Sequence, residues 1–92
     1  MMGSDVASRF GRNLARARRR AGVSQEELCS LSSIHRTEVS QLERGLRVPR
    51  IDTLVKLRDG LGVETDELLA GIRWRVGDYR PGGFIAEEGE RR

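Results

Sequence analysis

Polar side chains suited to hydrogen bonding with nucleic-acid bases recur along one side of an expected helix at residues 35–44. Arginine can donate to guanine O6 and N7 together, and glutamine can pair in the same bidentate manner with adenine N6 and N7. At about 3.6 residues per turn, Val39, Leu42 and Glu43 fall on the opposite side of this helix. We therefore expect one side to pack against the protein and the other to contact DNA bases. The expected base-reading residues are Arg36, Thr37, Ser40 and Gln41.

Basic side chains near the end of this helix are suited to binding phosphate oxygens. Arg44, Arg47 and Arg50 could hold the DNA backbone, although ordinary solvated arginines would look the same in sequence. His35 could approach a phosphate, more favourably when protonated, and an exposed histidine without a ligand is an equal alternative. Glu38 could accept a hydrogen bond from cytosine N4 or hold the neighbouring arginine in place.

A second short helix precedes the one that carries these side chains. Ser24 can accept a hydrogen bond from the backbone amide of Glu27 while the Glu27 side chain reaches back, a capping box that marks a helix start. A polar run around Ser33 ends this helix, and Ile34 turns inward before the next one begins. Two short helices joined by a tight turn form a helix-turn-helix, whose second helix enters the DNA groove.

Three further helices are expected around this pair. Apolar residues recur at spacings of three and four over residues 5–21 and again over residues 51–61, which indicates helices with one buried side. The second of these should end at Gly62, and a short helix at residues 65–70 should follow. Gly60 is expected to weaken its helix by about 1 kcal/mol relative to alanine. The side chains expected to be buried on residues 51–61 are Ile51, Leu54, Val55, Leu57 and Leu61.

The chain resembles the Cro and phage-repressor type of helix-turn-helix protein, the XRE family, in the fragments SQEEL, IHRTEVSQLERG, DTLVKL and LGV. The resemblance implies an all-α domain of five helices that acts as a sequence-specific transcriptional regulator, expected to be a repressor or autoregulator. It also implies that Gln25 contacts phosphate and that Arg18 forms a buried ion pair with Glu43. In this chain Ser33 replaces the glycine usual in the turn, and His35 replaces the usual Ser or Thr cap.

The pattern changes from helix to strand beyond Gly71. Ile72, Trp74 and Val76 alternate with arginines, which predicts a strand, and FIAE after a glycine-rich turn predicts a second one. The final residues, EEGERR, are expected to fray. The sequence therefore predicts a DNA-binding domain at residues 1–70 and a C-terminal extension at residues 71–92.

A homodimer is expected, because one recognition helix reads only a few base pairs. Two helices related by a two-fold axis can read half-sites about 34 Å apart on a near-palindromic operator. The extension could join the subunits, or it could fold back on its own domain. The candidate dimerisation residues are Leu68, Leu69, Ile72, Trp74 and Phe84.

Charge is distributed unevenly along the 92 residues. Residues 1–60 hold 12 basic and 7 acidic side chains, a balance of +5, whereas residues 61–92 hold 5 and 7, a balance of −2. The basic part coincides with the expected DNA-binding domain. No apolar run approaches the roughly 20 residues of a membrane-spanning helix, and no signal peptide is visible, so a cytoplasmic location without membrane contact is expected.

The sequence offers few residues for catalysis or metal binding. It contains one histidine and one cysteine, Cys29, which is expected to fill a small gap where helices cross. We therefore expect neither an enzyme nor a bound cofactor. Two alternatives stay open: an autoregulating antitoxin whose C-terminal extension binds a protein partner, and a controller protein of a restriction-modification system, which IHRTEVSQLERG also resembles.

Overall fold

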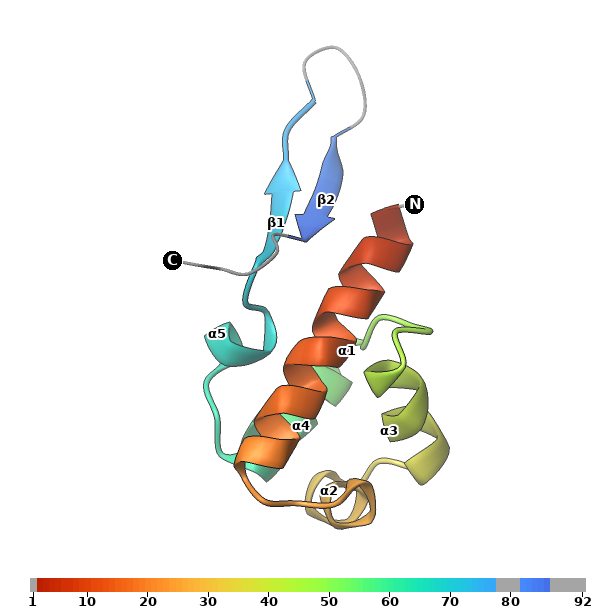
Figure 1. The fold of residues 1–92 in the computed structure, drawn as a ribbon, viewed down its shortest axis with the longest axis vertical. Coiled ribbons are helices and arrows are strands. Elements are labelled where there is room, and N and C mark those ends of the chain that lie inside the picture. The colour runs from red at the N-terminus through yellow and green to blue at the C-terminus, as the bar shows by residue number, and fades with distance from the viewer. Residues whose placement is uncertain (1, 78–81, 87–92) are drawn as a thin grey trace.

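Five helices are followed by a two-stranded hairpin (Figure 1). The computed structural model describes residues 2–77 and 82–86 of the chain. The helices are α1 (Met2–Arg20), α2 (Gln25–Ser32), α3 (Arg36–Glu43), α4 (Ile51–Leu61) and α5 (Thr65–Leu68), and the strands are β1 (Ile72–Arg75) and β2 (Gly83–Ala86). This arrangement confirms the predicted five-helix fold with a short C-terminal hairpin.

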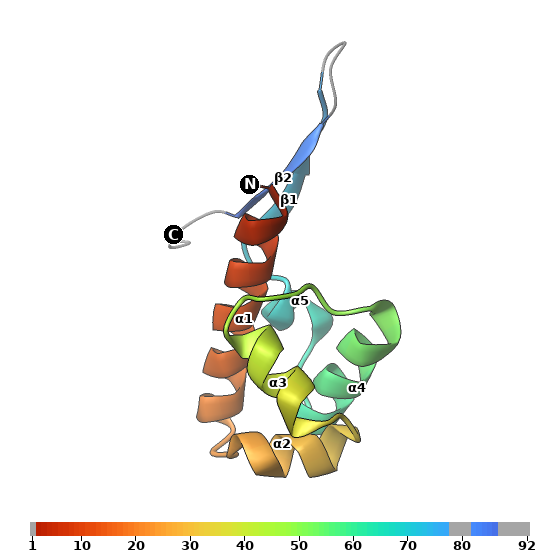
Figure 2. The ribbon, with the colours of Figure 1, turned by 90° about the vertical axis from the view of Figure 1, so that its right-hand side faces the viewer.

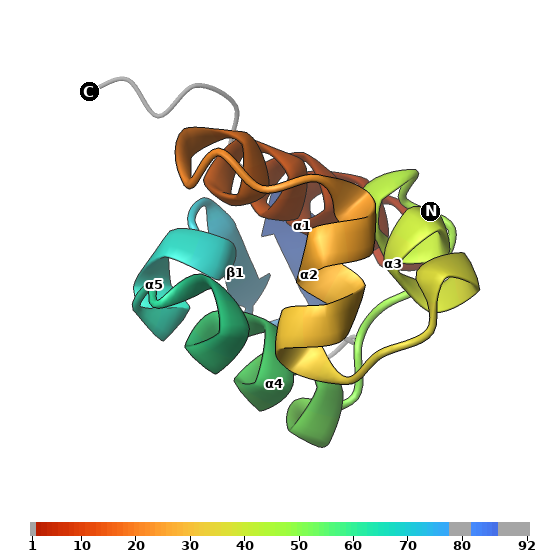
Figure 3. The same ribbon diagram turned by 90° about the horizontal axis from the view of Figure 1, so that it is seen from below.

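The core forms where the apolar sides of the five helices meet. Its side chains come from every helix, and each fully buried leucine contributes about 1.5–3 kcal/mol. The largest side chains with almost no exposed surface are Phe10, Leu14, Leu28, Val39, Leu42, Leu57 and Leu68. α2 and α3 lie side by side, with α1 packed on α3 and α4 packed on α2 (Figure 3). The core therefore supports the inner side of α3 and leaves its outer side open.

The ends of α2 follow the sequence closely. Ser24 Oγ accepts a hydrogen bond from the Glu27 amide at 3.0 Å, and Glu27 Oε1 accepts one from the Ser24 amide at 2.8 Å. The helix stops at Ser33, which adopts a left-handed conformation with φ of 57°. Only a few per cent of non-glycine residues have positive φ. Such a conformation persists where the surrounding structure determines it, and here α2 and α3 lie on either side of the turn.

Several sequence predictions differ from the structure. α1 begins at Met2 rather than at residue 5, and α5 ends at Leu68 rather than at residue 70. Ile51 and Val55 were expected in the core, but 76% and 38% of their surfaces are exposed. Thr53 and Leu57 lie on the core-facing side of α4. Ile51 and Val55, which are also four residues apart, lie on the neighbouring side of the helix and face outward.

Two glycines permit helices to approach closely. A Cβ atom on Gly11 of α1 would lie 2.5 Å from the carbonyl oxygen of Leu42 and 2.7 Å from that of Glu43. This contact sets the end of α3 directly on the α1 backbone. A Cβ atom on Gly60 would lie 3.2 Å from the Leu31 oxygen, so alanine there would gain helix propensity only at the cost of shifting α2.

The hairpin packs against α1, mainly through β2, and extends from one end of the helical domain (Figure 2). Its strands are antiparallel, and Trp74 pairs with Phe84. Their rings meet edge to face with centroids 5.1 Å apart, and 55% of Trp74 and 45% of Phe84 are exposed. Both predicted strands are therefore confirmed, whereas the predicted turn at residues 78–81 and the predicted frayed end at residues 87–92 lie outside the described residues.

Buried polar side chains of α1 hold the segment that leads into the hairpin. Arg9 Nε donates to the carbonyl oxygen of Ala70 at 2.9 Å, and Asn13 Nδ2 donates to those of Leu68 and Ala70 at the same distance. These bonds satisfy carbonyl groups at the end of α5 that the helix itself leaves unpaired. The connection between the domain and its extension is therefore part of the folded core.

Candidate nucleic-acid interface

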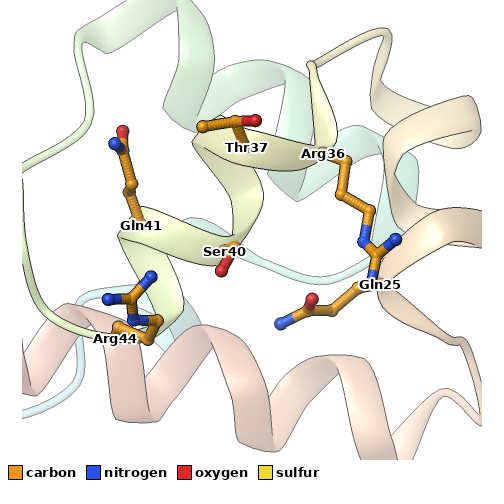
Figure 4. Close-up of a pocket in the computed structure, with 6 residues that line it drawn as sticks. All are labelled: Gln25, Arg36, Thr37, Ser40, Gln41 and Arg44. Atoms are coloured by element: carbon orange, nitrogen blue, oxygen red, sulfur yellow. The ribbon is translucent and has the colours of Figure 1, made fainter.

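The outer side of α3 lines an open hollow together with the start of α2 (Figure 4). Arg36, Thr37 and Arg44 are exposed, and Ser40 and Gln41 are half-buried. The hollow has a volume of about 340 Å³, and its lining residues are Gln25, Arg36, Thr37, Ser40, Gln41 and Arg44. The structure thus brings the four expected base-reading residues together with two of the expected phosphate contacts.

An ion pair between α1 and the end of α3 holds α3 in place. Arg18 Nε donates to Glu43 Oε2 at 2.6 Å and Arg18 Nη2 donates to Glu43 Oε1 at 3.0 Å, a bidentate contact between side chains that are 13% and 6% exposed. Arg18 Nη1 also donates to the carbonyl oxygen of Val23 at 2.9 Å. The hydrogen bond to Glu43 raises the pKa of Arg18 against the opposing effect of burial. The pair therefore joins α1, the segment before α2 and the end of α3.

Gln25 takes part in the same network. Its Nε2 atom donates to Glu43 Oε1 at 2.9 Å, so the carboxylate that anchors α3 also orients the first side chain of α2. The amide nitrogen has a second hydrogen that this bond does not use. Gln25 can therefore stay fixed to the protein while it donates to a phosphate oxygen. The sequence did not predict this contact.

Glu26 of α2 is the carboxylate that meets Arg36. Arg36 Nη1 lies 3.1 Å from Glu26 Oε2, and the two side chains are 61% and 74% exposed. The sequence pointed to Glu38 as one candidate for this role, and Glu26 performs it from the preceding helix. An exposed pair of this kind contributes at most about 1 kcal/mol, so its main effect is on the direction in which the guanidinium points.

The other expected phosphate contacts surround the ends of α3. His35 is the residue before α3, and its side chain makes no capping hydrogen bond. Arg47 Nη1 donates to Gln41 Oε1 at 3.1 Å, and Arg50 Nε lies 3.5 Å from Asp52 Oδ1 with its side chain 79% exposed. These groups are accessible to a ligand that covers the outer side of α3.

The expected dimerisation residues differ in their exposure. Leu68 is completely buried in the core of its own domain, so it has no surface to offer a second subunit. Ile72 is half-buried and packs against the core, whereas Leu69, Trp74 and Phe84 are exposed. The assignment of Leu68 is therefore corrected, and its neighbour Leu69 is exposed at the end of α5.

Within residues 2–77 and 82–86, no cluster of His, Cys, Asp or Glu is arranged to hold a metal ion. Over the same residues, no helix combines the length and the apolar character needed to cross a membrane.

The family model described as "Helix-turn-helix" (HTH_3) matches residues 14–68, from the middle of α1 to the end of α5. The chain belongs to this helix-turn-helix family. It is a DNA-binding transcriptional regulator of the XRE type, and α2 and α3 are the two helices of the motif. The hairpin lies outside the matched region.

Several relatives resemble this regulator over most of their length. It is 42% identical over 65 residues to the uncharacterized HTH-type transcriptional regulator y4dJ of Sinorhizobium fredii, a match that covers 71% of this chain and 84% of the relative. It is 33% identical over 69 residues to control protein C.BamHI of Bacillus amyloliquefaciens, covering 74% and 85%. The crystal structure of the restriction-modification controller protein C.AhdI from Aeromonas hydrophila superimposes with a TM-score of 0.65 and 37% identity, over 67% of this chain and 94% of that one.

Proposed function

We propose that this regulator binds a specific operator as a homodimer, inserts α3 of each subunit into the major groove, and acts as a repressor or autoregulator. The observation that carries the proposal is the hollow along α3, where four side chains suited to base edges lie together. Its inner side is anchored by the Arg18–Glu43 pair, which holds the reading side chains on a fixed element. Access to chromosomal DNA would place the protein in the cytoplasm.

Base reading would rest first on Arg36. It lies at the start of α3, the part of a recognition helix that approaches base edges most closely, and its guanidinium can donate to guanine O6 and N7. Thr37 and Ser40 can touch a thymine methyl group or a phosphate, and Gln41 lies one turn further along the same side. The proposal therefore concerns docking and recognition, and we assign no catalytic step to this chain.

Phosphate binding would rest on side chains around the edge of the hollow. Gln25 lies at the start of α2, where helix amide groups also favour an anion. The balance of +5 over residues 1–60 supplies the long-range attraction to DNA. The proposed phosphate contacts are Gln25, His35, Arg44, Arg47 and Arg50.

Replacing Arg36 with alanine is expected to weaken binding to the operator by about 1–3 kcal/mol and to relax the preference at one base position. Its effect on random DNA should be smaller, because the lost contacts are to a base. Arg50→Ala is the matched control, since it removes the same charge from an exposed position and should weaken all sequences about equally. Titration of both variants against operator and random duplexes separates the two roles, and equal losses on both DNAs for both variants would contradict them.

The proposed dimer would place two copies of α3 about one turn of DNA apart. The exposed apolar side of the hairpin, with Trp74 and Phe84, is our preferred contact between subunits, consistent with a separate role for residues 71–92 beside the DNA-binding residues 1–70. The structure adds a second candidate, because Ile51 at the start of α4 is 76% exposed and follows the exposed residues Leu46 and Val48.

The full chain is expected to sediment as a dimer at micromolar concentration. Trp74→Glu should shift it to the monomer, because a carboxylate cannot be buried in an apolar contact without a partner. Ile51→Glu is the control on the other exposed apolar surface and should leave the dimer intact. A monomeric wild type would refute the dimer, and a dimer lost only in Ile51→Glu would move the contact to α4.

A controller protein of a restriction-modification system is the second candidate. The similarity to C.BamHI and C.AhdI favours it, because those two proteins carry that function in their descriptions. An operator located upstream of an adjacent restriction endonuclease gene would support this role. An antitoxin that binds a protein through the hairpin is a further alternative, and a small protein that copurifies stoichiometrically with the full chain would favour it.

A further inference from the structure

We infer that Arg47 determines which base Gln41 reads, by occupying the amide oxygen of Gln41 so that its amide hydrogens select guanine over adenine. The inference rests on the proposed function, since it concerns recognition through α3. Its observation is the contact between Arg47 Nη1, in the loop after α3, and Gln41 Oε1, at 3.1 Å. The residue type of Arg47 alone would suggest a phosphate contact, because exposed arginines near DNA usually bind phosphate.

The chemistry of the two groups fixes the orientation of the Gln41 amide. A guanidinium only donates hydrogen bonds, whereas a glutamine amide has an accepting oxygen at one end and a donating nitrogen at the other. The end that meets Arg47 must therefore be the oxygen, and the NH₂ group must point away from Arg47. Gln41 is half-buried on α3 and lines the hollow, so the orientation of its amide decides which group it presents to a ligand.

Adenine and guanine place different groups on the major-groove edge. Adenine offers the N7 acceptor and the N6 amino donor, so a glutamine must supply both its oxygen and its nitrogen to bind it bidentately. Guanine offers two acceptors, N7 and O6. An amide that presents hydrogens alone matches guanine and leaves the adenine amino group without an acceptor.

The charge of Arg47 acts in the same direction. The amide oxygen has a second lone pair, so the hydrogen bond from Arg47 does not by itself prevent an approach by adenine N6. A guanidinium beside that oxygen does oppose it, because the cation repels the partially positive amino hydrogens and attracts guanine O6. This electrostatic preference increases when DNA covers the site and excludes water.

Arg47 is thus a positioning residue for specificity as well as a source of positive charge. This assignment differs from a pure phosphate contact in one measurable respect. A phosphate contact contributes equally on every sequence, whereas a residue that orients a base reader changes the preference at one base position. Loss of Arg47 should therefore shift the preference from guanine toward adenine at the position that Gln41 reads.

The test is selection of bound sequences from random duplex DNA by the full-length protein and four variants. Gln41→Ala identifies the position that Gln41 reads, because the preference there should be lost. At this position wild type should select guanine, and Arg47→Met should shift the ratio of guanine to adenine by roughly tenfold toward adenine. Gln41→Lys, which only donates, should keep guanine. Arg50→Met removes an equal charge and should lower affinity without changing any base preference.

Two results would overturn the inference while leaving the proposed function intact. One is selection of adenine by the wild type at the Gln41 position. The other is a uniform loss of affinity in Arg47→Met with an unchanged preference at that position. A wild-type protein that enriches no sequence would overturn both the inference and the proposed function. Thermal unfolding of each variant accompanies the selection, and because residues 47 and 50 are exposed, the folded state should be retained.

Discussion

Replacing Glu43 with alanine is expected to lower the free energy of unfolding by about 3–5 kcal/mol, because the guanidinium of Arg18 then stays largely buried without its counter-ion. Arg18→Ala should have an effect of similar size, since it leaves the Glu43 side chain, which is 6% exposed, without its cation and with the hydrogen bond from Gln25 still in place. Urea unfolding followed by circular dichroism measures both losses. The raised pKa of Arg18 keeps the guanidinium charged below strongly alkaline pH, so its charge should not limit stability in ordinary buffers.

A double-mutant cycle isolates the pair from other effects of the two substitutions. We expect a coupling free energy of about 1 kcal/mol or more between Arg18 and Glu43. Arg19→Ala is the matched control, because this neighbouring arginine is exposed and its loss should change stability by less than about 0.5 kcal/mol. Small and additive effects of Arg18→Ala and Glu43→Ala on the free energy of unfolding would show that the ion pair does not anchor α3.

DNA binding is expected to weaken by about 10⁴–10⁶-fold between 50 and 200 mM salt. The reason is release of counterions from the phosphates that a dimer neutralises, roughly four to six in each half-site. The concentration of positive charge in residues 1–60 motivates this expectation. Fluorescence anisotropy of a labelled operator at several salt concentrations measures the slope.

The proposed phosphate contacts can be examined by the same measurement. Arg50→Ala should reduce the salt slope by about one unit for each subunit, whereas Glu64→Ala, an exposed change remote from α3 in the sequence, should leave it unchanged. An affinity that does not depend on salt would contradict binding through the basic side chains of residues 1–60.

The helices were predictable because their patterns are local. The capping box at Ser24 and Glu27 marks the start of α2, and the alternation of Ile72, Trp74 and Val76 indicates the strand that follows α5. The residues that we propose to read bases could be grouped on one side of α3 from the sequence, because residue type and helical period together identify its outer side. These inferences need only the neighbours of each residue along the chain.

The remaining features depend on contacts between segments that the chain brings together only on folding. In the sequence, Gly11 is a residue of low helix propensity within an expected helix. Its role in close helix packing is visible only where α1 crosses the end of α3. The contacts of Glu26 with Arg36 and of Arg47 with Gln41 join different elements, so helical spacing cannot predict them. Ile51 and Val55 fit an apolar period, and their exposure is determined by which side of α4 the other helices cover.

Selection from random duplex DNA by the wild-type full chain tests most directly whether α3 reads a specific sequence. The proposed function predicts enrichment of a near-palindrome whose half-sites are separated by about 34 Å, with guanine at the position that depends on Arg36. A bound pool with no enriched sequence, at a salt concentration where the protein still binds DNA, would contradict sequence-specific recognition by this helix.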